Sequence, residues 1–225
     1  TNINRDCGSQ HIDAMTAKVR DCGAMLGIAA DGDGDRIIIC DEKGNRVDGD
    51  QIIAFLGKYY KEHNRLKADT VVATIVSNPA LDRFLEGIGV KCVRSAVGER
   101  YVNIGGEESG HMVVADYAKT GDTMMAALVI AMGLLQSGKK MSEIFPLFTS
   151  MTRKHIDSKF CGKDEMLAAF ELAAFQAEIK QGEADIAGKG RILVRKSGTE
   201  PKIQVWVWGD DVPLATAVSN RIASV

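Results

Sequence analysis

The hexapeptide from Asp31 to Arg36, DGDGDR, constrains the fold because it lies between two short apolar runs. The runs are Ala24–Ala30 (AMLGIAA) and Ile37–Cys40 (IIIC), and each is long enough for one strand. Glycines that alternate with short acidic residues favour a tight turn between such strands. The sequence therefore predicts two strands that are joined by an acidic turn.

Strands and helices alternate from the start of the chain to about Gly138. Apolar residues at helical spacing precede the first strand, and Gly23 is placed to end that helix. The later elements that we expect are helices over Gln51–His63 and Asn78–Gly89 and strands over Thr70–Val76 and Lys91–Val97. This alternation predicts parallel sheets with helical crossovers.

Met124 to Leu135 is the longest apolar run, and it is too short to span a bilayer. We predict a buried core helix there. The C-terminal part has a different, α+β pattern: one long helix over Lys163–Lys180, strands over Arg191–Val194 and Ile203–Trp208, and a last helix. We place domain boundaries near residues 47–50 and 148–152, which gives domains over 1–46, 47–150 and 151–225.

The overall charge argues against some classes of partner. The formal net charge is -2 and the sequence pI is about 6.1, so no basic field favours nucleic acid or an anionic membrane surface. The five cysteines lack a CxxC or Cys/His ligand spacing. They are typical of reduced thiols, and we expect a cytoplasmic protein with no membrane or nucleic-acid partner.

The acidic turn has the residue types of a metal site. Its glycines permit a tight backbone path on which Asp31, Asp33 and Asp35 can converge, and converging carboxylates repel each other unless a cation lies among them. Carboxylate oxygens suit Mg²⁺ or Ca²⁺, and Arg36 can bind a phosphate or a carboxylate through two hydrogen bonds. Three alternatives stay open: a solvated acidic turn, a calcium loop of the EF-hand kind, and a phosphatase loop with an aspartate nucleophile. Arg36 occupies the EF-hand position that requires glycine.

Two further loops carry groups that suit a phosphosugar. Gly105–His111 (GGEESGH) sets Glu107 and Ser109 among glycines, where they can bind sugar hydroxyls. Arg195–Pro201 (RKSGTEP) combines cations, hydroxyls and glycine-freed N–H groups, which suits a phosphate dianion. The structural alternatives are plain surface charges around a structural histidine and an ordinary basic hairpin turn.

Taken together and in this order, the three loops resemble the α-D-phosphohexomutase superfamily. DGDGDR resembles its metal-binding loop, GEESGH its sugar-binding loop and RKSGTEP its phosphate-binding loop. Finer features resemble the phosphoglucosamine mutase branch: Glu108 within GEES, Thr74–Asn78, Val97–Val102 and Asn2–Ser9. The resemblance implies an α/β fold in which three-layer, parallel-sheet mutase domains are followed by a small α+β C-terminal domain. It assigns residues 1–46 to the end of the metal-binding domain, 47–150 to the sugar-binding domain and 151–225 to the phosphate-binding domain.

The resemblance implies interconversion of glucosamine 6-phosphate and glucosamine 1-phosphate, in amino-sugar nucleotide and cell-wall precursor synthesis. A phosphoserine and a glucosamine 1,6-bisphosphate intermediate carry the phosphoryl group. One Mg²⁺ per active site would be bound by the three aspartates, with Arg36 beside the phosphoserine. The residues that would bind the sugar and the non-reacting phosphate are Glu107, Ser109, Arg195, Ser197, Gly198 and Thr199. His111, Arg100 and Glu107 stay open as the general acid/base.

Two features depart from the family pattern. The phosphoryl-carrying serine of the family lies in a SASHNP-like motif, which does not occur in this chain. We therefore expect the chain to start inside the second domain, to be inactive alone and to need the N-terminal domains of the same polypeptide. Asn103 also follows Val102 directly, where the family usually has about a helix's worth of residues. A homodimer, a phosphomannomutase/phosphoglucomutase and a silent fragment that binds Mg²⁺ and a phosphosugar remain alternatives.

Overall fold

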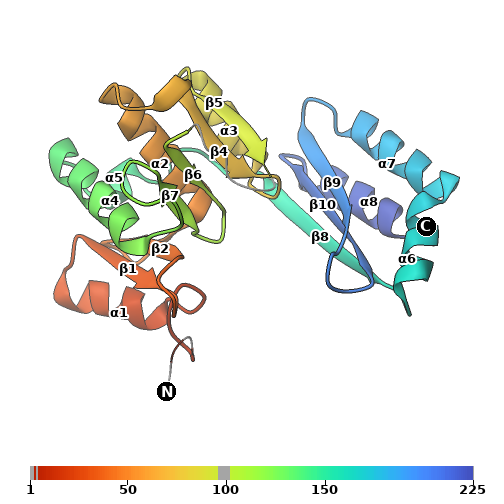
Figure 1. Cartoon of the computed structure of the whole chain (residues 1–225), viewed down its shortest axis with the longest axis horizontal. Coiled ribbons are helices and arrows are strands. Elements are labelled where there is room, and N and C mark those ends of the chain that lie inside the picture. Colours follow the sequence, from red (N-terminus) through yellow and green to blue (C-terminus); the bar gives the residue numbers. More distant parts are fainter. Residues whose placement is uncertain (1–2, 4, 96–101, 225) are drawn as a thin grey trace. The chain divides into compact units, whose positions relative to one another are not determined.

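The structure is a computed structural model that describes residues 3, 5–95 and 102–224. The chain divides into two compact units, residues 1–149 and 150–225 (Figure 1). Each unit has its own hydrophobic core. The α/β fold class with a small α+β C-terminal unit is confirmed.

The first unit opens with a helix and a small antiparallel sheet. α1 (Asp13–Cys22) ends at Gly23, whose φ of 65° is left-handed and closes the helix as predicted. β1 (Leu26–Ala30), β2 (Ile37–Asp41) and β3 (Arg46–Val47) form a sheet in that order. β1 and β2 pair antiparallel through the acidic turn, so the predicted strand pair is confirmed.

A second, mixed sheet forms the centre of this unit, with the order β5-β4-β6-β7. Its strands are β4 (Thr70–Thr74), β5 (Lys91–Ser95), β6 (Ile104–Gly106) and β7 (Met112–Val114). β4 is parallel to β5 and β6, whereas β7 runs antiparallel to β6. The expected parallel pairing is confirmed for β4 with β5 and β6, but the sheet is mixed because β7 is antiparallel, and the β1-β2-β3 sheet is antiparallel. Short turns join these strands, and a parallel pair needs a long crossover.

Helices cover this sheet and complete the core. α2 (Gly49–Glu62) is buried along most of its length, and Asp48 caps it by accepting a hydrogen bond from the Gln51 N–H at 3.0 Å. α3 (Pro79–Gly87) is capped by Asn78, as the sequence indicated. The other helical segments are the 3-10 turn η1 (Lys67–Asp69), α4 (Thr123–Ser137) and α5 (Met141–Ile144).

α4 is the core helix that we expected, but only one side of it is buried. Ala126, Ile130 and Leu134 pack into the core, whereas the opposite side of the helix is exposed. The exposed apolar side chains are Met124, Leu128, Met132 and Leu135. The sequence is apolar around the whole circumference, but the helix contacts the core on one side only. Among the described residues, no helix combines the length and apolar character that a membrane crossing needs.

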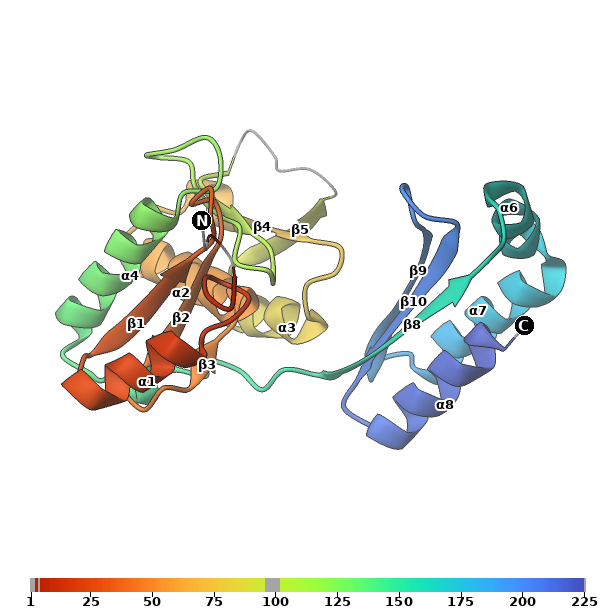
Figure 2. The same ribbon diagram turned by 90° about the horizontal axis from the view of Figure 1, so that it is seen from below.

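The second unit is a three-stranded antiparallel sheet with helices on one face (Figure 2). Its elements are β8 (Thr152–Lys159), α6 (Lys163–Glu171), α7 (Ala173–Asp185), β9 (Gly190–Lys196), β10 (Lys202–Gly209) and α8 (Val212–Ala223). β10 lies between β8 and β9. Ile203, Val205 and Val207 of β10 face the helices and belong to the core of this unit.

One expectation for this unit is wrong, and one strand was missed. The single helix over Lys163–Lys180 is two helices, because Leu172 has an extended ψ of 129° that breaks the helical path. β8 was not predicted at all. Its sequence, TRKHIDSK, carries polar or charged residues on both sides of the strand, so it lacks the apolar alternation by which a half-buried strand is recognised.

Candidate functional site

The three aspartates of the acidic turn come together at the end of β1. One carboxylate oxygen from each of Asp31, Asp33 and Asp35 lies within 4.8 Å of the others. Gly34 allows this path, since its φ is 74° and its N–H donates to the Asp31 carbonyl oxygen at 3.2 Å. The donor set is all oxygen and anionic, which fits a hard divalent cation such as Mg²⁺.

Arg36 lies against these carboxylates. Its Nε is 2.6 Å from Asp31 Oδ2 and 3.4 Å from Asp35 Oδ1, and its backbone N–H donates to Asp31 Oδ1 at 3.1 Å. Burial of Asp31 opposes ionisation, but the Arg36 N–H and guanidinium outweigh it and hold the pKa of Asp31 below its ordinary value. The turn is therefore organised to keep Asp31 anionic at neutral pH.

A tight hairpin between β6 and β7 carries the expected sugar-binding residues. The Gly110 N–H donates to the Glu107 carbonyl oxygen at 3.0 Å, and the Glu107 N–H donates to the His111 carbonyl oxygen at 3.0 Å. The Ser109 hydroxyl donates to Glu107 Oε2, also at 3.0 Å. Glu107 and Ser109 therefore present one connected pair of polar groups, which is suited to bridging vicinal hydroxyls.

The acidic turn and this hairpin contact each other directly. His111 Nδ1 lies 3.1 Å from Asp35 Oδ2, and the Ile37 N–H donates to the Gly110 carbonyl oxygen at 2.9 Å. Gly110 has a φ of 97°, and a Cβ there would lie 2.1 Å from the Ile37 carbonyl oxygen. The two loops are thus locked together inside the first unit by backbone contacts that require glycine.

Two charged residues that the sequence did not reveal, Asp50 and Arg94, lie near the C-terminal end of β4. Asp50, near the start of α2, is only 1% exposed, and its Oδ2 accepts from the Asn78 N–H at 2.7 Å. Burial raises the pKa of Asp50 to about 7, although the Asn78 N–H and the Ser77 side chain oppose the rise. Arg94 also donates to the carbonyl oxygens of Thr74 and Asn78. In the sequence, this turn was indicated by the Asn78-Pro79 cap and by the family resemblance of Thr74–Asn78, but not by Asp50 or Arg94.

The expected phosphate loop joins β9 to β10 in the second unit. Ser197 Oγ accepts from the Glu200 N–H at 3.2 Å, and the Ser197 N–H donates to the Lys202 carbonyl oxygen at 2.9 Å. A Cβ on Gly198 would meet no atom within 4 Å, so the loop backbone is accessible there. Arg195 and the Ser197–Thr199 segment therefore lie together at one end of this sheet.

The two cations of this loop point in different directions. Lys196 Nζ lies 4.7 Å from the centroid of the Phe170 ring of α6, on the helical face of the sheet. Arg195 is on the opposite face, as the alternation of a strand requires. Arg195 is consequently the cation of the loop that lies on the helix-free face of the sheet. Arg100, a tentative catalytic residue, lies outside the described residues.

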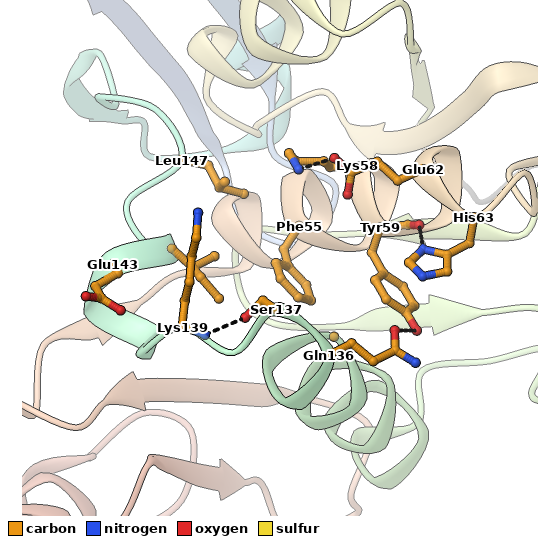
Figure 3. A pocket seen from close by; sticks show the side chains of 12 residues that line it. Phe55, Lys58, Tyr59, Glu62, His63, Gln136, Ser137, Lys139, Glu143 and Leu147 are labelled. Carbon is orange, nitrogen blue, oxygen red and sulfur yellow. Dashed lines mark hydrogen bonds and ion pairs between the residues drawn. The ribbon is translucent and has the colours of Figure 1, made fainter.

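A pocket of about 520 Å³ lies elsewhere in the first unit, among α2, α4 and α5 (Figure 3). Phe55, Tyr59 and His63 of α2 line one side, and Gln136 of α4 accepts a hydrogen bond from the Tyr59 hydroxyl at 3.0 Å. None of the residues expected from the sequence to bind metal or sugar lines it. The candidate site is therefore built by the loops and not by this pocket.

Comparisons with family models cover most of the chain. Residues 48–151 match the model described as phosphoglucomutase/phosphomannomutase, alpha/beta/alpha domain III. Residues 159–225 match the model of the phosphoglucomutase/phosphomannomutase C-terminal domain. The first match includes the Glu107–Gly110 hairpin and the second includes the Arg195–Thr199 loop.

Curated relatives point to one branch of the family. The chain is 44% identical to the phosphoglucosamine mutase of Paramagnetospirillum magneticum, over 98% of the chain and 51% of that protein. It is 43% identical to the phosphoglucosamine mutase of Rhodospirillum centenum, over 100% of the chain and 49% of that protein. The chain thus spans about half the length of the curated relatives it matches.

Solved structures support the fold. Aspergillus fumigatus N-acetylphosphoglucosamine mutase, in complex with GlcNAc-6P and magnesium, matches with a TM-score of 0.71 and 19% identity, over 98% of this chain and 52% of that chain. A phosphoglucomutase/phosphomannomutase family protein from Burkholderia thailandensis matches with a TM-score of 0.71 and 16% identity, over 96% and 49%. By its sequence, its fold and both domain models, the chain belongs to the phosphoglucomutase/phosphomannomutase family and corresponds to the C-terminal half of its phosphoglucosamine mutase members.

Proposed function

We propose that the chain is the C-terminal part of a phosphoglucosamine mutase, which interconverts glucosamine 6-phosphate and glucosamine 1-phosphate. The observation that carries this proposal is the contact between the acidic turn and the Glu107–Ser109 hairpin, through His111 and Asp35. Asp35, one of the proposed cation ligands, thereby lies next to the hairpin that carries Glu107 and Ser109. The identity to curated phosphoglucosamine mutases supports the choice of substrate.

The reaction would proceed by two phosphoryl transfers. In the first, the P–O bond of a phosphoserine from the preceding domains breaks and a new P–O bond forms to the free sugar hydroxyl, whose proton leaves to a base. Glucosamine 1,6-bisphosphate then reorients, and its other phosphoryl group returns to the serine. Glu107 and His111 are the candidates for the base among the described residues of the hairpin.

Each loop has one task in this scheme. Asp31, Asp33 and Asp35 would hold one Mg²⁺, which when bound neutralises the charge of the transferring phosphoryl oxygens. Magnesium in the Aspergillus relative's complex supports this choice of cation. Arg36 would leave its ion pair with Asp31 and face the phosphoserine. Glu107 and Ser109 would bind sugar hydroxyls in both orientations that a mutase must accept.

The second unit would bind the phosphate that is not reacting. Arg195, Ser197, Gly198 and Thr199 offer a guanidinium, two hydroxyls and an accessible backbone for a dianion. Binding at this remote end would orient the reacting end of the sugar. We place the enzyme in the cytoplasm, in the synthesis of amino-sugar nucleotides for cell-wall precursors.

One competing function follows from a specific observation. The competing proposal is a protein that binds Mg²⁺ and a phosphosugar without turnover, because the 225 residues contain no SASHNP-like motif. The mutase and the binding protein without turnover both require the same metal site. A phosphomannomutase/phosphoglucomutase remains the alternative enzyme. Measuring turnover of glucosamine, mannose and glucose 6-phosphates by the complete enzyme distinguishes it from the proposed phosphoglucosamine mutase.

The metal assignment is tested by calorimetric titration of Mg²⁺ into the chain. Asp33→Asn should weaken binding about tenfold or more, since it removes one of three converging charges. Asp21→Asn, an exposed aspartate on α1, is the matched control and should bind as the parent chain does. Equal Mg²⁺ affinity for Asp33→Asn and the parent chain would contradict the proposed site. Loss of mutase turnover by Asp33→Asn in the complete enzyme tests the function itself.

A further inference from the structure

The helix-free face of the C-terminal sheet carries an ordered polar and aromatic cluster beside the 197–199 loop. Gln204 and Trp206 are two positions apart on the central strand β10, so their side chains lie on the same face. The β9 residue directly opposite Gln204 is Arg195, and the β8 residue opposite Trp206 is His155. These four side chains therefore meet around the base of the loop.

Trp206 supports the Arg195 guanidinium. The Arg195 Cζ lies 5.0 Å from the centroid of the Trp206 ring, within the range of a cation–π contact. His155 stacks on Trp206, with a centroid distance of 4.6 Å and an interplanar angle of 1°. Trp206 is only 7% exposed and contacts both of these neighbours. The indole is thus fixed, and it limits where Arg195 can lie.

Gln204 holds Arg195 without neutralising it. Arg195 Nε donates to Gln204 Oε1 at 3.2 Å, and Gln204 Nε2 donates to Asp157 Oδ1 at 3.3 Å. Asp157 in turn pairs with Lys202 Nζ and with His155 Nε2, both at 2.8 Å. A neutral amide therefore separates Arg195 from the anionic Asp157. In the described part of the chain, no carboxylate forms an ion pair with Arg195.

This arrangement differs from that of an ordinary surface arginine. A carboxylate partner would satisfy the guanidinium and compete with any incoming anion. Here the Arg195 Nε donates to the Gln204 amide, and the flat face of the guanidinium lies against the Trp206 indole. The two Nη groups therefore stay available as charged hydrogen-bond donors for an anion. The side-chain entropy that an anion must overcome on binding is also reduced, because Arg195 is already ordered.

We propose that Gln204 and Trp206 are positioning residues that hold Arg195 ready for the non-reacting phosphate of the phosphosugar. The inference rests on the proposed function, because it assumes that Arg195 binds this phosphate. Gln204 and Trp206 do not themselves contact the ligand. They set the direction of the guanidinium fork, and through it the orientation of the sugar.

The same strand offers a matched control. Arg191 Cζ lies 4.8 Å from the centroid of the Trp208 ring, so Arg191 and Trp208 form a second cation–π pair on this face. This pair lies near Gly190 and Gly209, at the opposite end of the strands from the 197–199 loop. Trp208 is the other tryptophan of the chain. Its removal should perturb the sheet without changing Arg195.

The first experiment asks whether Arg195 is held. In the NMR spectrum of the chain, the Arg195 Nε–Hε signal should be protected from exchange with water, because that proton is donated to Gln204. Gln204→Leu should abolish the protection, and Trp208→Leu should leave it intact. Equal exchange rates in the parent chain and Gln204→Leu would overturn the inference, whatever the function of the protein.

The second experiment asks whether this positioning matters for the ligand. In the complete enzyme, affinity for glucosamine 6-phosphate and melting temperature are measured together. Trp206→Leu and Gln204→Leu should each weaken binding about three- to tenfold, the size of one cation–π contact or one hydrogen bond. Trp206→Phe should recover most of the affinity, since the ring remains. Trp208→Leu should change affinity less than about twofold.

The outcomes separate the inference from the proposed function. If Arg195→Ala binds glucosamine 6-phosphate normally, the assignment of the phosphate loop fails. If Arg195→Ala loses affinity but Gln204→Leu and Trp206→Leu do not, the positioning inference alone fails. It fails equally if Trp208→Leu weakens binding as much as Trp206→Leu, because the effect then comes from general loosening of the sheet.

Discussion

Replacing Asp50 by Asn should make the first unit more stable relative to the parent chain as the pH rises. Asp50 is 1% exposed, and its Oδ1 has no hydrogen-bond partner in the described part of the chain. Burial raises the pKa of this carboxyl from 3.8 to about 7, and Asp48 and Glu108 add repulsion. Ionisation therefore opposes folding, and the amide of asparagine cannot ionise.

The size and sign follow from linkage. Because folding raises the pKa of Asp50, the protonated carboxyl stabilises the folded state. This contribution is complete below the unfolded-state pKa and is lost as the pH rises through the folded-state pKa. One pKa unit corresponds to about 1.4 kcal/mol, so the shift from 3.8 to about 7 is worth roughly 4 kcal/mol in full. Between pH 5 and pH 8, the parent chain should lose about 2–3 kcal/mol of unfolding free energy relative to Asp50→Asn.

The assay is urea unfolding at pH 5, 6, 7 and 8, followed by circular dichroism and by tryptophan fluorescence. Trp206 and Trp208, the two tryptophans, both lie on β10 in the second unit. Their fluorescence therefore reports a transition that Asp50→Asn should leave unchanged, which is an internal control. A stability difference between Asp50→Asn and the parent chain that does not vary from pH 5 to pH 8 would refute the reasoning.

Three further predictions concern the loops. Gly110→Ala should destabilise the first unit by at least about 2–3 kcal/mol in urea unfolding, since the new Cβ would lie 2.1 Å from the Ile37 carbonyl oxygen at a φ of 97°; a change below 1 kcal/mol would show that the hairpin can move away. Arg195→Ala should weaken the complete enzyme's affinity for glucosamine 6-phosphate about ten- to a hundredfold, and Arg195→Lys should recover only part, because an ammonium cannot form two parallel hydrogen bonds. The chain alone should not convert glucosamine 6-phosphate, because it has no SASHNP-like serine; steady turnover in a coupled assay would contradict the phosphoserine mechanism.

The candidate loops could be located in the sequence because the functional side chains of each loop are close neighbours along the chain. Alternating aspartate and glycine between two apolar runs predicted the β1–β2 turn, and the turn forms with its carboxylates together. The caps at Gly23 and Asn78 were equally local, since a cap satisfies backbone groups within a few residues of itself. What the sequence pattern could not give was the partner of each loop.

Elements without a local signal were missed for a related reason. β8 forms because β10 offers it a ladder of hydrogen bonds, not because TRKHIDSK has a strong preference for a strand. The long helix expected after Lys163 breaks at Leu172, whose extended ψ of 129° has no local signal such as a proline or a glycine in the sequence. The exposed side of α4 was missed for the same reason. The helix is apolar all round, so only its packing against the core determines which side is buried.

By itself, the sequence determined the order of the three loops, the turn chemistry of DGDGDR and the family to which the chain belongs. Only the tertiary structure decided that His111 meets Asp35, that Asp50 is buried against Asn78, and that Arg195 rests on Trp206 and Gln204. These pairs join residues from different strands and helices, several of them far apart in the chain. Their contacts exist only after the sheets have formed, because pairing register and burial set their distances and, for Asp50, the pKa of the carboxyl.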